Sequence, residues 1–326
     1  MSIVSEKVID KALKEYGITE KEICMITERS DRLVWRVTTQ KGDYALKFVA
    51  KKSASTIAEV SKYLAKMGVP VIIVLPTIYG DSFVRLKDGC LLLFPWVKGA
   101  VPRYEEPNMT ERIVTLLAIF HERSRGFVSQ ANSVKSNLDW PSYYSKRIKF
   151  LNEISLMARS DSNPFFQLFF DHYSWLQKRC TWVIERLPHT GFTNLAKLAR
   201  LDPLLGHGDY SQANLLLDNN GELTIIDLDN VSISLPIWDL SRLITWMNHA
   251  LQDWSLERFE MVLNTYQQVR ELTENEKELL LIDQVFPHQV IDLARKYNRK
   301  TAGPTTFEEL KRSIEIDKKK IRDLRL

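Results

Sequence analysis

The sequence predicts an α+β protein with two lobes, a small one built on an antiparallel sheet and a larger helical one. Strand-like runs of β-branched and aromatic residues dominate residues 23–97, with one main helical segment among them. Helical spacing dominates after residue 99, and a short strand pair around the hairpin-turn sequence Asn219-Asn220-Gly221 interrupts it. We therefore expect an N-terminal β-rich lobe at residues 1–96 and a C-terminal helical lobe at residues 97–326.

The composition is that of a globular protein and excludes several classes of function. The 326 residues are 44% hydrophobic and 26% charged, which is enough for a core in each of two lobes. No stretch approaches the roughly 18 uncharged apolar residues of a membrane span. The charged N-terminus lacks the apolar core of a signal peptide, and the net charge of +4 is too small for a dedicated nucleic-acid binder. We expect cytoplasmic synthesis and no membrane or nucleic-acid partner.

The cysteines and histidines form no metal-binding pattern. The three cysteines, Cys24, Cys90 and Cys180, lie far apart, so neither a disulfide framework nor a zinc cluster is expected. His121 sits on an apolar helix face and is expected to be a core histidine.

The N-terminal lobe is expected to contain two helical segments, at residues 5–17 and 54–67. The remaining apolar runs are interpreted as strands because they are short, β-branched and bounded by glycine, proline or charged residues. These runs are residues 23–28, 33–40, 43–50, 71–76, 81–87 and 90–97. The first three, with Lys41-Gly42 between the last two of them, predict an antiparallel meander.

The C-terminal lobe is expected to be helical at residues 110–126, 140–158, 165–187, 194–200 and most of 236–326. Its tryptophans Trp238, Trp246 and Trp254 recur every eight residues, which favours a place in the core. An aromatic cage for a quaternary ammonium group is the alternative.

One segment carries a pattern suited to chemistry. His207-Gly208-Asp209 is followed five residues after Asp209 by Asn214, on a loop leading into an apolar strand. The predicted hairpin then returns the chain to nearly the same place and presents Asp227 after a second apolar strand. Two carboxylates and an amide oxygen would thus converge, and hard oxygen ligands of this kind suit Mg²⁺. The alternative is a turn with a hydrogen-bonded aspartate, which explains one Asp but not the ordered set.

This pattern resembles the catalytic loop of the aminoglycoside phosphotransferase and choline kinase group, small-molecule kinases with a protein-kinase-like fold. Ile225-Ile226-Asp227 and Asp239-Leu240 follow in the order seen in that group. The resemblance implies ATP as phosphoryl donor, Asp209 as the catalytic residue that orients or deprotonates the acceptor hydroxyl, and Asn214 and Asp227 as Mg²⁺ ligands. It also implies that His207 braces the loop.

The N-terminal third can be tested against the same idea. A kinase needs a strand lysine for the nucleotide phosphates and an acidic helix residue to orient it. Lys47 and Ala45 share one face of a predicted strand, as expected for a phosphate-facing lysine beside a small residue over adenine. Glu59 is the only acid in the following helix, which makes it the expected partner of Lys47. An exposed strand lysine is the alternative reading of Lys47 alone.

The connector between the lobes gives a further match. By position, Phe94 would close the rear of an adenine pocket, the Pro95 carbonyl would accept from the adenine amino group, and the Val97 N–H would donate to the ring. The missing N–H of Pro95 does no harm, because only its carbonyl is needed. A plain strand-end proline is the alternative.

One element departs from the pattern. A loop that covers phosphates is usually rich in glycine, because backbone amides must approach closely. Here residues 28–33 read Glu-Arg-Ser-Asp-Arg-Leu, and Ser30 or Arg32 would have to serve instead. The missing glycines leave open whether the chain turns over ATP.

Within the group, the runs HGDYSQANLLLD, TIIDLDN and WDLSRLI are most similar to the CotS-type spore-coat-associated kinase-like proteins of spore-forming bacteria. This likeness implies a place on the spore coat and other coat proteins as partners. Two functions therefore compete. The first is an ATP- and Mg²⁺-dependent phosphotransferase acting on a hydroxyl of a small molecule or a coat component. The second is a structural coat protein that keeps the kinase-like fold as a scaffold.

Overall fold

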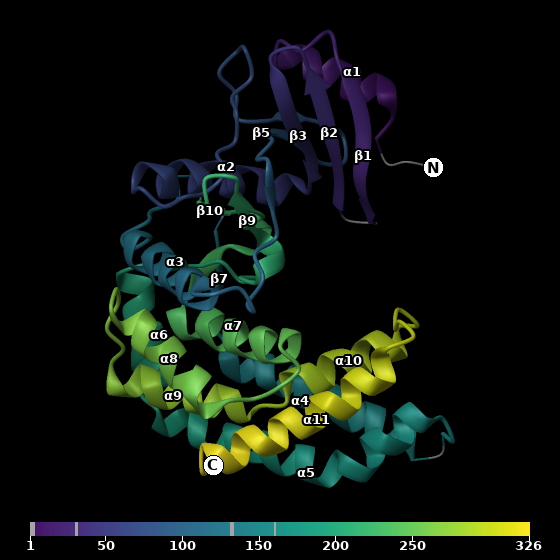
Figure 1. The fold of residues 1–326 in the computed structure, drawn as a ribbon, viewed down its shortest axis with the longest axis vertical. Helices are drawn as coiled ribbons and strands as arrows, with labels where there is room; N and C mark the ends of the chain where they lie inside the picture. Colours follow the sequence, from purple (N-terminus) through teal and green to yellow (C-terminus); the bar gives the residue numbers. More distant parts are fainter. Residues whose placement is uncertain (1–3, 30–31, 131–133, 160) are drawn as a thin grey trace. The chain divides into compact units, whose positions relative to one another are not determined.

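The computed structural model describes residues 4–29, 32–130, 134–159 and 161–326 (Figure 1). Its internal contacts divide the chain into two compact units that do not follow the chain order. The first unit contains Met1–Pro102, Arg123–Lys135 and Gln212–Ser232, and the second contains Arg103–Glu122, Ser136–Ser211 and Ile233–Leu326. The expected division at residues 96 and 97 into two continuous lobes stays a prediction.

The first unit is built on a five-stranded antiparallel sheet in the order β1-β2-β3-β5-β4. Its strands are β1 (Glu22–Arg29), β2 (Arg32–Thr39), β3 (Gly42–Val49), β4 (Val84–Arg85) and β5 (Cys90–Pro95). Two helices accompany them, α1 (Glu6–Glu15) and α2 (Lys51–Lys66). The meander, both helices and the strand before the connector were expected.

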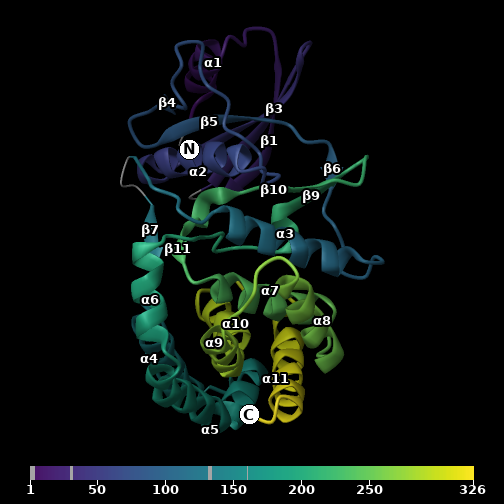
Figure 2. The ribbon, with the colours of Figure 1, turned by 90° about the vertical axis from the view of Figure 1, so that its left-hand side faces the viewer.

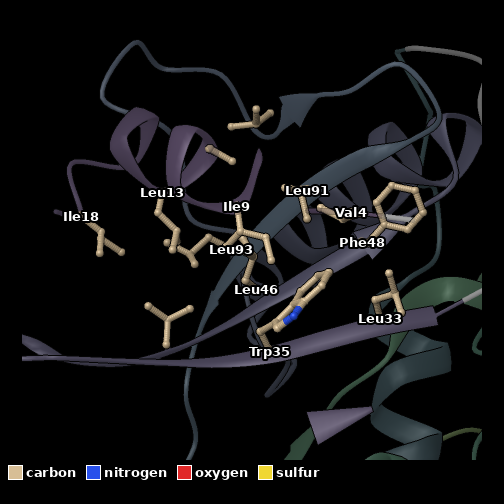
Figure 3. Close-up of a cluster of buried hydrophobic side chains, with 13 residues drawn as sticks. Val4, Ile9, Leu13, Ile18, Leu33, Trp35, Leu46, Phe48, Leu91 and Leu93 are labelled. Atoms are coloured by element: carbon tan, nitrogen blue, oxygen red, sulfur yellow. The ribbon is translucent and has the colours of Figure 1, made fainter. Parts of the chain in front are cut away.

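The core of this unit lies on one face of the sheet, against α1. Trp35, Leu46 and Leu93 are cross-strand partners on β2, β3 and β5, and all three are buried. Ile9 and Leu13 of α1 pack into the same cluster (Figure 3). Because successive strand residues point to opposite faces, the residues on either side of Leu46 are directed away from this core.

The expectation of a strand at residues 71–76 is wrong. The segment makes only single bridges, from Val71 to Ile225 and from Leu75 to Leu93. Pro70 and Pro76 enclose it, and a proline cannot donate to a sheet ladder, so regular pairing stops at both ends. The run expected as a strand at residues 81–87 is also shorter than its pattern suggested, since β4 has two residues.

Residues 212–232 complete the first unit with the expected hairpin. β9 (Leu215–Asp218) and β10 (Leu223–Ile225) pair with each other, and β9 also pairs with β6 (Gly99–Ala100), a short strand that the sequence did not reveal. Only glycine fits at position 99, because a Cβ there would lie 2.7 Å from the Leu217 carbonyl oxygen. Two short 3₁₀ turns, η2 (Gln212–Asn214) and η3 (Leu228–Asn230), flank the hairpin.

The second unit is helical, as the sequence predicted. Its helices are α3 (Met109–Arg123, whose last residue belongs to the first unit), α4 (Trp140–Ala158), α5 (Pro164–Arg186), α6 (Phe192–Leu201), α7 (Pro236–Ala250), α8 (Leu256–Gln267), α9 (Glu274–Val285), α10 (His288–Asn298) and α11 (Thr306–Asp323). α4 packs on α5, α7 on α9, and α10 on α11 (Figure 2). The short turn η1 (Leu187–His189) follows α5.

A third small sheet, in the order β7-β11-β8, has most of its residues in the second unit. Its strands are β7 (Lys135–Asn137), β8 (Leu205–Gly206) and β11 (Ser232–Ser234), each too short to show a period in the sequence. Across the described residues, no helix is long and apolar enough to cross a membrane.

Candidate functional site

The first unit contains a cavity of about 370 Å³ on the sheet face opposite the α1 core. Such a volume suits a small-molecule site. The lining changes character from one end to the other. Most of it is apolar, and its members include Val34, Ala45, Ile57, Ile72, Phe94, Leu216 and Ile225. The polar residues of the lining are Thr27, Lys47, Asn214, Asp227 and Asp229.

Lys47 forms the centre of the polar part. Its Nζ lies 2.9 Å from Oδ1 of Asp227 and 2.6 Å from Oδ1 of Asp229. Lys47 is 9% exposed, so burial would penalise its charge if no carboxylate were near. The fold thus places one cation and two anions together at the end of an apolar cavity, 180 residues apart in sequence.

Glu59, the expected partner of Lys47, has a different neighbour. Its Oε2 accepts a hydrogen bond from Ser129 Oγ at 2.8 Å, and its side chain lines another hollow of the first unit, with Lys62 and Arg85. Among the described residues, the ion-pair partners of Lys47 are the two aspartates. An orienting role for Glu59 stays a prediction.

Asn214 and Asp227 are held on neighbouring backbone segments. The Ile226 N–H donates to the Asn214 carbonyl at 2.9 Å, and the Ile225 N–H donates to the Pro70 carbonyl at 2.8 Å. Asp227 itself adopts a left-handed conformation, with φ of 65°, which aspartate tolerates better than bulkier residues. The backbone that leads into Asp227 is therefore held by two hydrogen bonds to other segments.

The connector residues Phe94, Pro95 and Val97 all line this cavity, and their roles toward adenine stay predictions. The Val97 N–H makes no hydrogen bond within the described chain, whereas the Trp96 N–H donates to the Asp43 carbonyl at 3.0 Å. Trp96, which the sequence did not single out, also lines the cavity, with the Arg36 guanidinium 4.8 Å from its ring centroid. Ser30 lies outside the described residues, as does the side chain of Arg32.

Asp209 belongs to the second unit, where a buried aspartate holds its loop. Oδ1 of Asp239 accepts from the Gly208 N–H at 2.9 Å, and Oδ2 accepts from the His207 N–H. The Asp209 N–H in turn donates to His207 Nδ1 at 3.3 Å. Gly208 has a φ of 79°, which glycine adopts without strain.

Asp239 stays ionised although it is fully buried. Burial alone would raise the pKa of its carboxyl, but the hydrogen bond with His121, the nearby imidazoles and the Gly208 N–H hold that pKa below its ordinary value. Nε2 of His121 lies 3.2 Å from Asp239 Oδ2, and Nδ1 lies 2.8 Å from the Tyr266 hydroxyl. His121 is thus a core histidine, as expected, and its position is behind the loop that carries Asp209.

Around Asp209 the second unit has a cavity of about 180 Å³. Its lining combines aromatic, charged and polar side chains, namely Tyr143, Asp209, Trp238, Arg242, Thr245, Trp246, His288, Gln289 and Asp292. Three of these, Trp238, Arg242 and Trp246, stand four residues apart on α7. That spacing puts them on one helix face, and it is the sequence signal that could have found the site. Trp254 is a core residue with no exposed surface, as expected, whereas the expected place of Trp246 in the core is wrong, since its side chain is 46% exposed.

The donor set fits a nucleotide with a hard cation. Apolar side chains suit an adenine ring, Lys47 suits phosphate, and Asn214 and Asp227 provide oxygen atoms on the same cavity. No three His, Cys, Asp or Glu side chains in the described ranges gather in a way that could hold a metal. A cation there would need further oxygen from phosphate or water, which is how Mg²⁺ is usually bound.

Comparison with known proteins gives a consistent result. The model of the phosphotransferase enzyme family matches residues 23–272. Spore coat protein S of Bacillus subtilis (strain 168) is 24% identical in an alignment of 310 residues, which covers 90% of this chain and 84% of that protein.

Solved structures share the fold. The aminoglycoside phosphotransferase from Alicyclobacillus acidocaldarius subsp. acidocaldarius DSM 446 matches with a TM-score of 0.79 at 17% identity, covering 97% of this chain and 95% of the other. Spectinomycin phosphotransferase APH(9)-Ia, in complex with ADP and spectinomycin, matches with a TM-score of 0.69 at 15% identity, covering 98% and 99%. The expected α+β protein-kinase-like fold, with an N-terminal antiparallel sheet and a helical C-terminal part, is confirmed.

Proposed function

The chain belongs to the phosphotransferase enzyme family, and we propose that it transfers the γ-phosphoryl group of ATP to a hydroxyl of a small molecule or of a spore-coat component. The observation that carries this proposal is the cluster of Lys47, Asp227 and Asp229 at the polar end of an apolar cavity. A protein that used the fold only as a scaffold would have no need for a buried lysine and two aspartates there, since hydrophobic residues of the same volume are often as stable.

ATP would bind in the first unit's cavity. Adenine would lie beside Ala45 and Phe94, with the Pro95 carbonyl accepting from its amino group and the Val97 N–H donating to its ring. Lys47 would contact the phosphates, with Glu59 as its orienting residue once a nucleotide competes for the lysine. Binding of ADP by spectinomycin phosphotransferase supports the nucleotide assignment.

Asn214 and Asp227 would hold Mg²⁺, which when bound would offset the negative charge of the phosphates. Asp229 is a further candidate ligand, since it shares Lys47 with Asp227.

Asp209 would act on the acceptor. Its carboxylate would take the proton of the acceptor hydroxyl, whose oxygen would then form a bond to the γ-phosphorus while the bond from that phosphorus to the β,γ-bridging oxygen breaks and ADP leaves. Asp239 and His207 hold the loop in place, so little reorganisation would be needed at the moment of transfer.

The Asp209→Asn variant tests this function. Turnover is expected to fall by roughly 10²–10⁴, the range associated with a positioned general base. Nucleotide affinity and melting temperature should stay unchanged, because the nucleotide contacts proposed here come from other residues. The measurement is phosphoryl transfer, or ATP hydrolysis where no acceptor is known, with nucleotide binding and thermal unfolding measured alongside. Equal turnover in both proteins would remove Asp209 from the mechanism.

Asp227 and Asp229 provide a second, matched test. We expect Asp227→Asn to weaken Mg²⁺-dependent nucleotide binding more than Asp229→Asn, because backbone contacts fix the position of Asp227 directly after a buried strand. Calorimetric titration of ATP with and without Mg²⁺ distinguishes the two variants. An equal loss in both would mean that the carboxylates act as a pair.

A structural role on the spore coat is the second candidate function. The distant homology to spore coat protein S favours it, as does the absence of glycine from residues 28–33. Under this proposal the chain would bind other coat proteins. The general similarity of the motifs to those of the coat protein CotI is part of this second proposal. If the wild-type protein shows no phosphoryl transfer in a broad acceptor screen and no binding of ATP in a titration, the structural role is favoured.

A further inference from the structure

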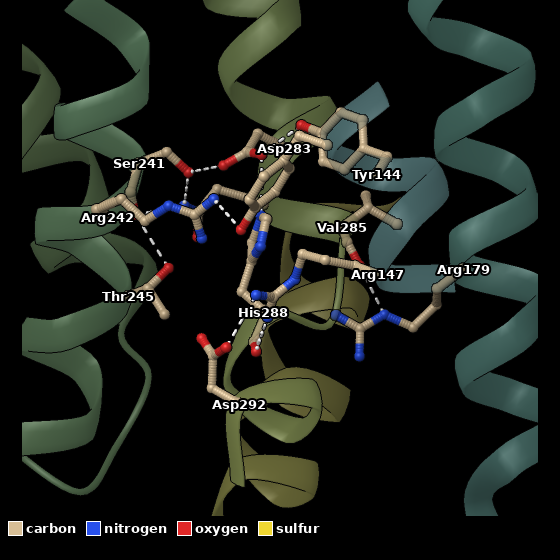
Figure 4. A network of polar contacts seen from close by, with 12 residues as sticks. Tyr144, Arg147, Arg179, Ser241, Arg242, Thr245, Asp283, Val285, His288 and Asp292 are labelled. Carbon is tan, nitrogen blue, oxygen red and sulfur yellow. Dashed lines mark hydrogen bonds and ion pairs between the residues drawn. The ribbon is translucent and has the colours of Figure 1, made fainter. Parts of the chain in front are cut away.

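The cavity around Asp209 contains a cation that the proposed transfer does not use. Arg242 reaches into it from α7, in the direction of His288 (Figure 4). Its Nη2 donates to the Tyr143 hydroxyl at 3.1 Å, and no carboxylate of the described chain lies within ion-pair distance of it. The guanidinium is therefore held in place by a neutral partner and keeps its positive charge.

The neighbouring carboxylates are already engaged. Asp292 is 2.8 Å from Nη1 of Arg147. Asp283 accepts hydrogen bonds from His288 Nε2 at 2.9 Å and from the hydroxyls of Tyr144 and Ser241. Burial alone would lower the pKa of Arg242, but the charges of Tyr143, Asp283, Tyr144 and Asp292 act on it through space and raise that pKa above its ordinary value. Arg242 is thus the cation in this lining that lacks an ion-pair partner.

Arg242 also occupies the aromatic faces of the cavity. Its Cζ lies 4.3 Å from the ring centroid of Trp238 and 5.6 Å from that of Tyr143. A quaternary ammonium or other cationic acceptor would need those same ring faces and would meet a positive charge on them. Of the tryptophans considered for an aromatic cage, Trp238 is thus covered by the protein's own guanidinium.

We propose that the acceptor is a small hydroxylated anion, with a carboxylate or phosphate group that binds Arg242 and a hydroxyl that faces Asp209. The proposal rests on the proposed function for the identity of the cavity as an acceptor site. It makes Arg242 a specificity-determining residue that selects anionic over cationic acceptors.

Three probes of one carbon skeleton test the charge preference: D-glycerate, glycerol and 3-amino-1,2-propanediol, which share a vicinal diol and differ only in the third group. Binding to the full chain is measured by ligand-observed NMR titration. D-Glycerate is expected to bind at least about tenfold more tightly than either analogue, as for one charge-assisted contact. Arg242→Gln should bring the three affinities together, and Arg242→Lys should restore part of the preference.

Arg186→Gln is the matched control, since Arg186 also lies over a tryptophan ring, 5.1 Å from the centroid of Trp182, on the exposed side of α5. It should leave all three affinities unchanged. A preference for the amine, equal binding of all three probes, no binding of any of them, or an unchanged preference in Arg242→Gln would each overturn the proposal.

Transfer from ATP to D-glycerate is measured separately, so that the two failures differ. Arg242-dependent binding of D-glycerate without transfer would refute the proposed function but leave the anion site. Transfer only to a cationic acceptor would support the proposed function but refute the anion site at Arg242.

Discussion

Asp239 holds the backbone of the loop that carries Asp209. Its two carboxylate oxygens accept from two consecutive backbone N–H groups, and one of them also contacts His121. A buried carboxylate is stable only when such partners surround it. The same residue therefore contributes to stability and to the position of Asp209.

Asp239→Asn should lower the free energy of unfolding by about 3 kcal/mol, because the amide loses the charge and turns an N–H donor toward groups that also donate. Urea denaturation measures this change. Asp253→Asn is the control, since Asp253 pairs with Lys319 at 2.8 Å on the surface and should cost less than about 1 kcal/mol. Similar losses in the two variants would show that Asp239 is not the brace inferred here.

At the scale of single residues, the sequence predicted which residues belong together but not every partner. Lys47, Ala45, Phe94, Pro95, Val97, Asn214 and Asp227 do line one cavity. The ion pair of Lys47 with Asp229 was not predicted, since it depends on the turn after β10 and on the left-handed backbone at Asp227. Spacing in a sequence carries no information about such a turn.

At the scale of elements, α9 begins with a complete capping box. Thr273 accepts from the Glu276 N–H through its side chain, and the Glu276 side chain accepts from the Thr273 N–H at 3.0 Å. Two N–H groups that would lack partners at a helix start are thereby satisfied. α9 packs on α7, so this cap also supports the helix that carries Arg242.

Thr273→Ala should destabilise the protein by about 1 kcal/mol, the usual cost of losing an N-cap side chain. Thr305→Ala is a matched control, because Thr305 precedes α11 without a side-chain cap bond. Thermal unfolding of both variants decides the point. A larger effect at Thr305 than at Thr273 would contradict the capping assignment.

Helices and long strands could be predicted because the regular spacing of their apolar residues repeats over enough positions to be recognised in the sequence. Short elements could not. β6, β7, β8 and β11 have two or three residues each, and their existence depends on partners distant in sequence. The strand predicted at residues 71–76 is wrong for a related reason. Its apolar run is typical of a strand, but Pro70 and Pro76 limit its pairing with other strands.

At the scale of the whole molecule, a falling pH should begin to destabilise the fold near pH 6.5, which is well above the pH at which carboxyl groups usually titrate. Burial, together with the charge of Arg242, lowers the pKa of His288 to about 4. Between about pH 6.5 and pH 4, the folded state keeps this imidazole largely neutral and so binds fewer protons than the unfolded chain. The stability from His288 is therefore complete above pH 6.5 and is lost as the pH falls toward 4.

Between pH 7 and pH 5.5, wild type should lose about 1 kcal/mol more unfolding free energy than His288→Gln. The glutamine keeps a donor for Asp283 but cannot titrate. Urea denaturation at a series of pH values gives both curves. Parallel curves for the two proteins would mean that His288 does not contribute to the pH dependence.

The placement of residues 212–232 in the first unit has a consequence for how the protein is made. At about 5–20 residues per second, a ribosome needs on the order of ten seconds to extend the chain from residue 102 to residue 232. Throughout this interval Lys47 has been synthesised without Asp227 and Asp229, and the Ile72 N–H lacks the Ile225 carbonyl, its later partner at 3.2 Å. The first unit is thus completed late, and the nascent protein carries an open apolar cavity until residue 232 has been translated.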